Sequence, residues 1–261
     1  MLHKYITVFF FISTVLVGNL SVSQSVWAET LVHSTTEIRL VLALRVGQEE
    51  LQKFLPATWQ AAPAPGGPIK DANLFVLFID PLLFQDAQGK PDVAATNRYT
   101  VLAVPGKHTQ TGEVAVVVIT GGVASAIASV PGAYKTSVHG TVKREQTYKG
   151  ANSEGGIVDD FWEVQDTQGG TMELRIQYER ALPLRTKLDQ KIYSAVEPTF
   201  YRIYRQDIAM DLVKSIPAGV DRVKNYRLNV TMPKLKNLFN GSEQLIGVFA
   251  YPMFVRQIYL P

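Results

Sequence analysis

The sequence predicts a mostly β, α+β fold in which an antiparallel, barrel-like sheet carries a few short helices. Three observations lead to this prediction. Runs rich in β-branched and aromatic residues dominate the chain, Gly, Pro or Asp residues bound them, and helix patterns are few and short. The connections between these runs are too short for the crossover helices of a parallel sheet. We expect a single domain over residues 29–261, because that length supports one large β-rich core.

Strand signals recur along the whole of that range. The first half of the chain holds four apolar runs, at residues 38–46, 72–80, 98–106 and 113–120. The second half continues the series at residues 136–148, 157–165, 171–180, 200–206, 226–232 and 254–260. The sequence DTQGG, which separates two of these runs, predicts a hairpin turn.

Helix signals are limited to three short segments. Residues 47–55 place Leu51, Phe54 and Leu55 on one face, and Pro56 stops the pattern. Residues 123–129 are rich in alanine and precede a Pro-Gly pair, which predicts a second short helix. The segment MPKLKNLFNG predicts a third helical turn before the final strands.

Residues 1–28 have the pattern of a secretory signal peptide. Lys4 precedes a short apolar run, and the small-residue spacing at Val26 and Ala28 suits cleavage between Ala28 and Glu29. The alternative is an uncleaved membrane anchor, but the run is shorter than the ~20 apolar residues that span a bilayer. We therefore expect a secreted or periplasmic protein with no stable membrane span after processing.

Composition argues against several classes of function. Without Lys4, 25 basic side chains face 23 acidic ones, which gives no reason to expect a nucleic acid as partner. Cysteine is absent, and the three later histidines lie in no metal-ligand spacing. The chain also lacks a G-x-S-x-G elbow, a P-loop and a dinucleotide-binding glycine motif. The sequence thus predicts neither a metal nor an organic cofactor.

Lys135 is isolated from other charges in the sequence. It lies in VPGAYKTSVHG, with Glu113 as the nearest preceding charge and Lys143 as the next. A lysine held away from water has a lowered pKa and becomes a usable amine nucleophile. The alternative interpretation is a surface loop that carries a lysine, which is common.

The order of the segments resembles the acetoacetate decarboxylase family over essentially all of residues 29–261. That family opens with a strand carrying a glutamate and a short helix, and its reactive lysine follows a small alanine-rich helix. The matching segments are EIRLVLALRVGQEELQKFLPATWQ, RYTVLAVPG, EVAVVVIT, GGVASAIASVPGAYK, TSVHGTVKRE, PTFYRIYRQ, YRLNVTMPKLKNLF and YPMFVRQIYLP.

The resemblance implies a role for Lys135 as a Schiff-base catalyst. In the family, the matching lysine condenses with a β-keto acid, the protonated imine accepts the electrons released as carbon dioxide leaves, and hydrolysis frees the ketone. On this basis we expect Lys135 to point into an enclosed, apolar cavity with a lowered pKa. Tyr99, Tyr134 and Arg98 are the candidate substrate-binding residues.

The sequence also departs from the family pattern. Thr136 replaces a second lysine, and Thr36 replaces an arginine just before Glu37. Arg39 or Arg98 are candidates to replace that arginine, although Arg39 could equally face outward from its strand. No carboxylates match the two that lie near the family's pocket.

Two main hypotheses follow. The first is an exported, cofactor-independent carboxy-lyase or related Schiff-base lyase that acts on a small keto acid through Lys135. The second is a catalytically silent member of the same fold that binds an apolar or carbonyl-containing small molecule. A lipocalin-type carrier is a third hypothesis that shares the barrel-like sheet but not the position of Lys135. Assembly into a homo-oligomer is implied by the resemblance alone.

Overall fold

The computed structural model describes residues 29–93, 95–123, 135, 137–150, 155–167 and 169–261. Strands dominate these residues, and the α-helical part of the described chain is α1 (Gln48–Gln52). The mostly β fold predicted from the sequence is confirmed. Residues 1–28 lie outside the described part, so the signal peptide remains a prediction. No described helix combines the length and apolar character that crossing a membrane requires.

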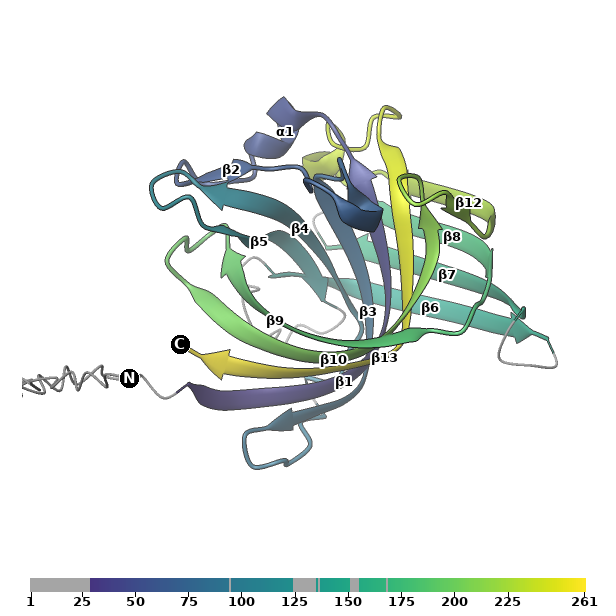
Figure 1. Cartoon of the computed structure of the whole chain (residues 1–261), viewed down its shortest axis with the longest axis horizontal. Helices are drawn as coiled ribbons and strands as arrows, with labels where there is room; N and C mark the ends of the chain where they lie inside the picture. Colours follow the sequence, from purple (N-terminus) through teal and green to yellow (C-terminus); the bar gives the residue numbers. More distant parts are fainter. Residues whose placement is uncertain (1–28, 94, 124–134, 136, 151–154, 168) are drawn as a thin grey trace, which may run out of the picture.

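Seven strands form a closed ring (Figure 1). Each pairs with the next, and the last pairs with the first, in the order β4–β5–β9–β10–β13–β1–β3. All pairings in the ring are antiparallel except that of β5 with β9. The ring strands are β1 (Thr30–Arg45), β3 (Leu74–Asp86), β4 (Tyr99–His108), β5 (Val114–Val123), β9 (Leu184–Ser194), β10 (Tyr201–Ser215) and β13 (Gln244–Leu260).

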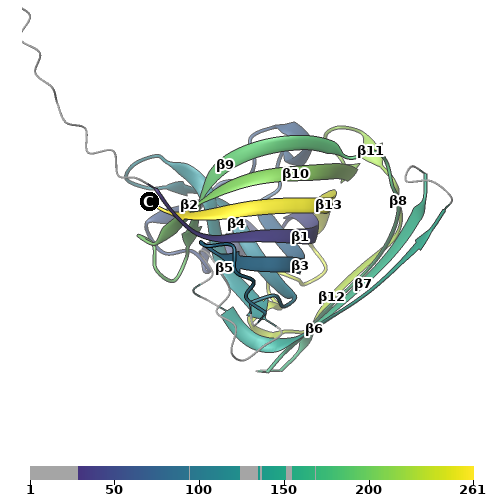
Figure 2. The same ribbon diagram turned by 90° about the horizontal axis from the view of Figure 1, so that it is seen from below.

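An outer sheet continues from the ring and covers one side of it (Figure 2). Its strands are β6 (Ser137–Lys149), β7 (Ile157–Asp166), β8 (Thr171–Glu179) and β12 (Val223–Val230). β6 pairs with β5 in parallel, so the ring and the outer sheet share one hydrogen-bonded sheet. Two short strands add to the ring strands: β2 (Trp59–Ala61) pairs with β4, and β11 (Val220–Asp221) pairs with β10.

The two-residue period of β1 explains how the ring has two different faces. Leu40, Leu42 and Leu44 are fully buried in the core shared with the outer sheet, while alternate residues face the ring interior. Trp162 of β7 meets Phe78 of β3 in the same core, with ring centroids 5.5 Å apart. Full burial of each such leucine contributes about 1.5–3 kcal/mol, so this layer supplies much of the stability.

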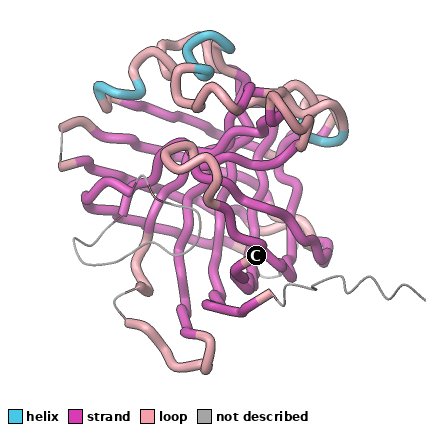
Figure 3. The backbone as a smooth tube through the Cα atoms, turned by 90° about the vertical axis from the view of Figure 1, so that its left-hand side faces the viewer, coloured by secondary structure: helices cyan, strands magenta, loops and turns pink. Residues whose placement is uncertain are grey.

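The helical segments lie at one end of the molecule (Figure 3). The predicted helix at 47–55 is confirmed in its first half as α1, and the following residues form tighter turns whose N–H groups bond to the carbonyl three residues earlier. The third predicted helical turn is the 3₁₀ segment η2 (Pro233–Leu235), and a further 3₁₀ segment, η1, spans Gly67–Ile69. The helix predicted at 123–129 falls almost entirely outside the described residues; Val123 ends β5.

The hairpin predicted at DTQGG joins β7 to β8. Gly170 has a φ of 90°, and a Cβ there would lie 2.7 Å from Met232 Cα. Glycine is therefore required by both backbone conformation and space.

Candidate ligand-binding site

The interior of the ring contains a cavity of about 400 Å³ that is partly open to the outside. All seven ring strands contribute to its lining, and η1 adds Pro68 and Ile69. Most of the lining is apolar and includes Leu77, Val101, Ala103, Val116, Val118, Ile192 and Ile208. The polar side chains of the lining are Arg39, Gln190, Tyr204, Gln206 and Tyr251. A size of 300–1,000 Å³ with apolar walls and few polar groups is typical of small-molecule sites.

A buried ionic network lies beside this cavity. Glu37, which is fully buried, accepts hydrogen bonds at Oε1 from Arg256 Nη2 at 2.8 Å and from the Tyr99 hydroxyl at 3.3 Å. Its Oε2 accepts a hydrogen bond from Arg39 Nε at 2.5 Å and also contacts Arg39 Nη2. Arg256 Nη2 further donates to the Tyr99 hydroxyl at 3.1 Å. One carboxylate is therefore shared by two arginines from opposite ends of the described chain.

The network keeps Glu37 ionised. Burial alone would raise the pKa of its carboxyl, but the charges of Arg256 and Arg39 outweigh burial and lower the pKa below its usual value. The same network fixes the orientation of both guanidinium groups, because each donates to a different oxygen of one carboxylate.

Arg39 connects this network with the cavity. It is 5% exposed, lines the cavity, and places its guanidinium carbon 3.5 Å from the centroid of the Phe254 ring. Glu37, Tyr99 and Arg256 are not part of the cavity lining. Of the two orientations that the sequence left open for Arg39, the inward one is therefore the one observed.

Lys135 does not have the surroundings expected from the sequence. Its side chain is 46% exposed, and its Nζ lies 3.6 Å from Glu197 Oε2 and 4.3 Å from the Phe200 ring centroid. The expectation of an enclosed lysine without a carboxylate partner is wrong, because Glu197 approaches from a distant part of the chain. Lys135 is still close to the ring interior, since Phe200 packs on a buried cluster that contains the cavity residues Val101 and Val118.

The other predicted site residues are dispersed. Tyr99 is 2% exposed and belongs to the Glu37 network, one layer behind the cavity wall. Arg98 is 43% exposed and pairs with Asp80 at 2.9 Å, outside the cavity. Tyr134 lies outside the described residues. The structure thus joins Tyr99 to the ring interior and does not bring Arg98 there.

Arg256 is a central residue of the network that the sequence reasoning missed. The sequence did contain an indication of this role. Arg256 lies two residues after Phe254 and two before Ile258, so in a strand all three side chains point to the same, apolar face. It is fully buried in the structure. A charge that interrupts an apolar face requires a partner, and here that partner is Glu37.

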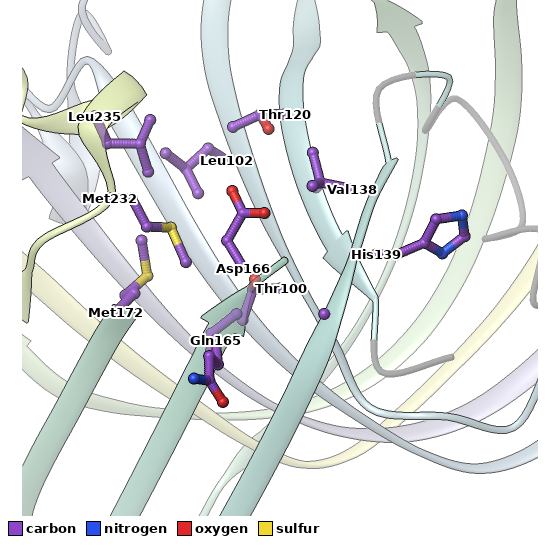
Figure 4. A pocket seen from close by; sticks show the side chains of 13 residues that line it. Thr100, Leu102, Thr120, Val138, His139, Gln165, Asp166, Met172, Met232 and Leu235 are labelled. Atoms are coloured by element: carbon purple, nitrogen blue, oxygen red, sulfur yellow. The ribbon is translucent and has the colours of Figure 1, made fainter. Parts of the chain in front are cut away.

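Two further cavities lie between the ring and the outer sheet. The larger, about 230 Å³, contains Arg144, which binds Asp160 through Nε at 3.0 Å and Nη2 at 2.9 Å, and Asp80 through Nη1 at 3.0 Å. The smaller, about 40 Å³, is too small for an organic substrate and is bounded by Thr120, Asp166 and neighbouring residues. Figure 4 shows the His139 side chain pointing away from this smaller space.

Comparison with solved structures identifies the fold. An acetoacetate decarboxylase-like enzyme from Sphingomonas wittichii RW1 matches with a TM-score of 0.52 and 12% identity, over 88% of this chain and 93% of that chain. The enduracididine biosynthesis enzyme MppR matches with a TM-score of 0.49 and 13% identity, over 88% of this chain and 86% of that chain. An acetoacetate decarboxylase from Legionella pneumophila matches with a TM-score of 0.45 and 10% identity, over 89% of this chain and 86% of that chain.

The sequence itself matches no protein-family model and no curated protein. The ring, the outer sheet and their order nevertheless define the class of fold. The chain has the acetoacetate decarboxylase-like fold, and the resemblance noted in the sequence is confirmed at that level. Within the described residues, no three His, Asp or Glu side chains gather as a metal site.

Proposed function

We propose that this protein binds an apolar or carbonyl-containing small molecule inside the ring. The observation that supports this proposal best is the cavity of about 400 Å³, with its apolar walls and few polar side chains. Export is part of the proposal: β1 begins at Thr30, immediately after the expected cleavage site at Ala28.

Filling the cavity is expected to weaken ligand binding. Val116 lines the cavity, so tryptophan at this position occupies ligand volume; we expect Val116→Trp to weaken binding of a neutral hydrophobic fluorophore by about tenfold or more. The matched control is Val114→Trp, because Val114 lies two residues earlier on β5 and is 69% exposed. Fluorescence titration measures both. Equal affinities of the wild type and Val116→Trp would exclude the ring interior as the site.

A Schiff-base lyase acting through Lys135 is the second candidate function. The observation that favours it is the position of Lys135 over Phe200, beside the cluster that supplies part of the cavity wall. In this mechanism the lysine amine adds to a substrate carbonyl and water leaves, which gives an imine. The protonated imine accepts the electron pair when carbon dioxide departs, which gives an enamine. The enamine takes a proton from water on carbon, and hydrolysis of the resulting imine then frees the ketone and the lysine.

Reductive trapping tests this second function. With acetoacetate or pyruvate and borohydride, a Schiff-base enzyme forms a covalent adduct that mass spectrometry detects, and Lys135→Ala is expected to lose it. Lys191→Ala is the matched control, because Lys191 is 45% exposed, pairs with Glu113 at 3.2 Å and lies 5.1 Å from the Tyr201 ring. Absence of the adduct, or its persistence in Lys135→Ala, would exclude Lys135 as a Schiff-base nucleophile and leave the binding function.

A further inference from the structure

The ionic network beside the cavity has more positive than negative charge. Among the described residues, its ionised members are Glu37, Arg39 and Arg256, which are 0%, 5% and 0% exposed. Arginine remains protonated in proteins, and Glu37 is kept ionised by its two partners. The formal charge of this group is therefore +1, in an interior that is otherwise mainly apolar.

Excess buried charge is costly unless a counter-charge compensates it. Arg39 is the member of the network that reaches the cavity, since Glu37 and Arg256 are absent from its lining. The contacts of Arg39 with Glu37 use Nε and Nη2. Nη2 makes only an ionic contact with Glu37 and is buried with no hydrogen-bond partner within the described part of the chain, so the guanidinium retains donors for an acceptor.

The walls near Arg39 indicate the rest of the ligand. Phe254 stacks on the guanidinium, and valine, leucine and isoleucine side chains from the other strands line most of the remaining cavity. A small polar acid would satisfy Arg39 but leave most of the apolar wall uncovered. A ligand with an apolar body and one anionic end would satisfy both.

We infer that the ring cavity takes an amphipathic monoanion, with a carboxylate at Arg39 and an apolar body along Val101, Val116 and Ile192. This inference rests on the proposed binding function and specifies the ligand class for it. Recognition is non-covalent and requires no bond to Lys135. Arg39 then selects carboxylates over neutral molecules of the same length.

Paired probes that differ only in charge test the inference. Decanoate and decanol have the same chain length, and isothermal titration of the full chain gives both affinities. We expect the wild type to bind decanoate at least about tenfold more tightly than decanol, and Arg39→Gln to reduce that ratio to about one. Arg45→Gln is the matched control, because it removes the same charge from an exposed position on the same strand.

The possible results separate this inference from the proposed function. If decanol binds and decanoate binds no more tightly, or if Arg45→Gln reduces the ratio as much as Arg39→Gln does, selection of the carboxylate by Arg39 is refuted while ring binding stands. If neither probe binds and Val116→Trp changes no other ligand's affinity, the proposed function itself fails. A ratio that falls to about one only in Arg39→Gln supports the inference, and a cooperative thermal unfolding transition shows that the variant is folded.

Discussion

Replacing Glu37 with glutamine is expected to destabilise the fold by about 3–5 kcal/mol at neutral pH. The substitution keeps the shape of the side chain but removes the carboxylate that Arg39 and Arg256 share, so two buried guanidinium groups lose their counter-charge. Denaturant unfolding of the purified variant measures the loss. Glu29→Gln is the control, because Glu29 is 34% exposed and its pair with Arg205 lies at the surface, where such pairs contribute about 0–1 kcal/mol.

The destabilisation should also depend on pH. Because the pKa of Glu37 in the folded state lies below its usual value of 4.5, its stabilising effect is present above that value and is lost as pH falls through the folded pKa. The difference in free energy of unfolding between wild type and Glu37→Gln is therefore expected to become smaller below about pH 4.5. A difference in unfolding free energy of less than about 1 kcal/mol at pH 7 would contradict the stabilising role of this network.

Replacing Arg144 with methionine is the second change with a large expected effect. Arg144 is 6% exposed and pairs with Asp160 and Asp80, whose side chains are 1% and 15% exposed, between the ring and the outer sheet. Burial would lower the pKa of Arg144, but its hydrogen bonds to the two aspartates raise it instead. Without the arginine, the buried Asp160 loses its charged partner, while Asp80 keeps its pair with Arg98, and we expect a loss of about 3–5 kcal/mol by denaturant unfolding.

A neighbouring lysine provides the control for Arg144. Lys143 is 68% exposed, points to the opposite face of β6 and pairs with Glu163 at the surface, so Lys143→Met should cost less than about 1 kcal/mol. Burial raises the pKa of Asp160, and Arg144 opposes that effect. In Arg144→Met the hydrogen bond from Gln146 remains but the opposing charge is gone, so the contribution of Asp160 to stability is greatest below its unfolded pKa and is lost as pH rises. Equal losses of stability in Arg144→Met and Lys143→Met would refute the structural role of Arg144.

Much of the fold could be predicted because strand signals are local. The apolar runs at 38–46, 72–80, 98–106 and 113–120 all lie in or overlap observed strands. β9 was missed because residues 184–187 are exposed on both faces, and charged residues such as Arg185 and Lys187 interrupt the apolar pattern there. Its parallel pairing with β5, which helps to close the ring, joins segments more than 70 positions apart and has no local signature.

The candidate site was less predictable because its partners come together only through the tertiary structure. The sequence left the orientation of Arg39 open, and Arg256, which completes the network, is 219 positions from Glu37. For Lys135 the sequence was misleading, because isolation from charges along the chain did not mean isolation in space. Glu197, more than 60 positions away, lies beside it in the fold.

The position of β13 in the ring has a consequence for how the protein folds during synthesis. β13 follows every other described strand in the chain, yet it pairs with β1 on one side and β10 on the other, from Thr30 opposite Leu260 to Lys214 opposite Val248. Until β13 leaves the ribosome, the facing edges of β1 and β10 have no partner, and unpaired edges promote aggregation. Closure therefore waits for the most sequence-distant contacts of the described chain, which predicts slow folding that benefits from a chaperone.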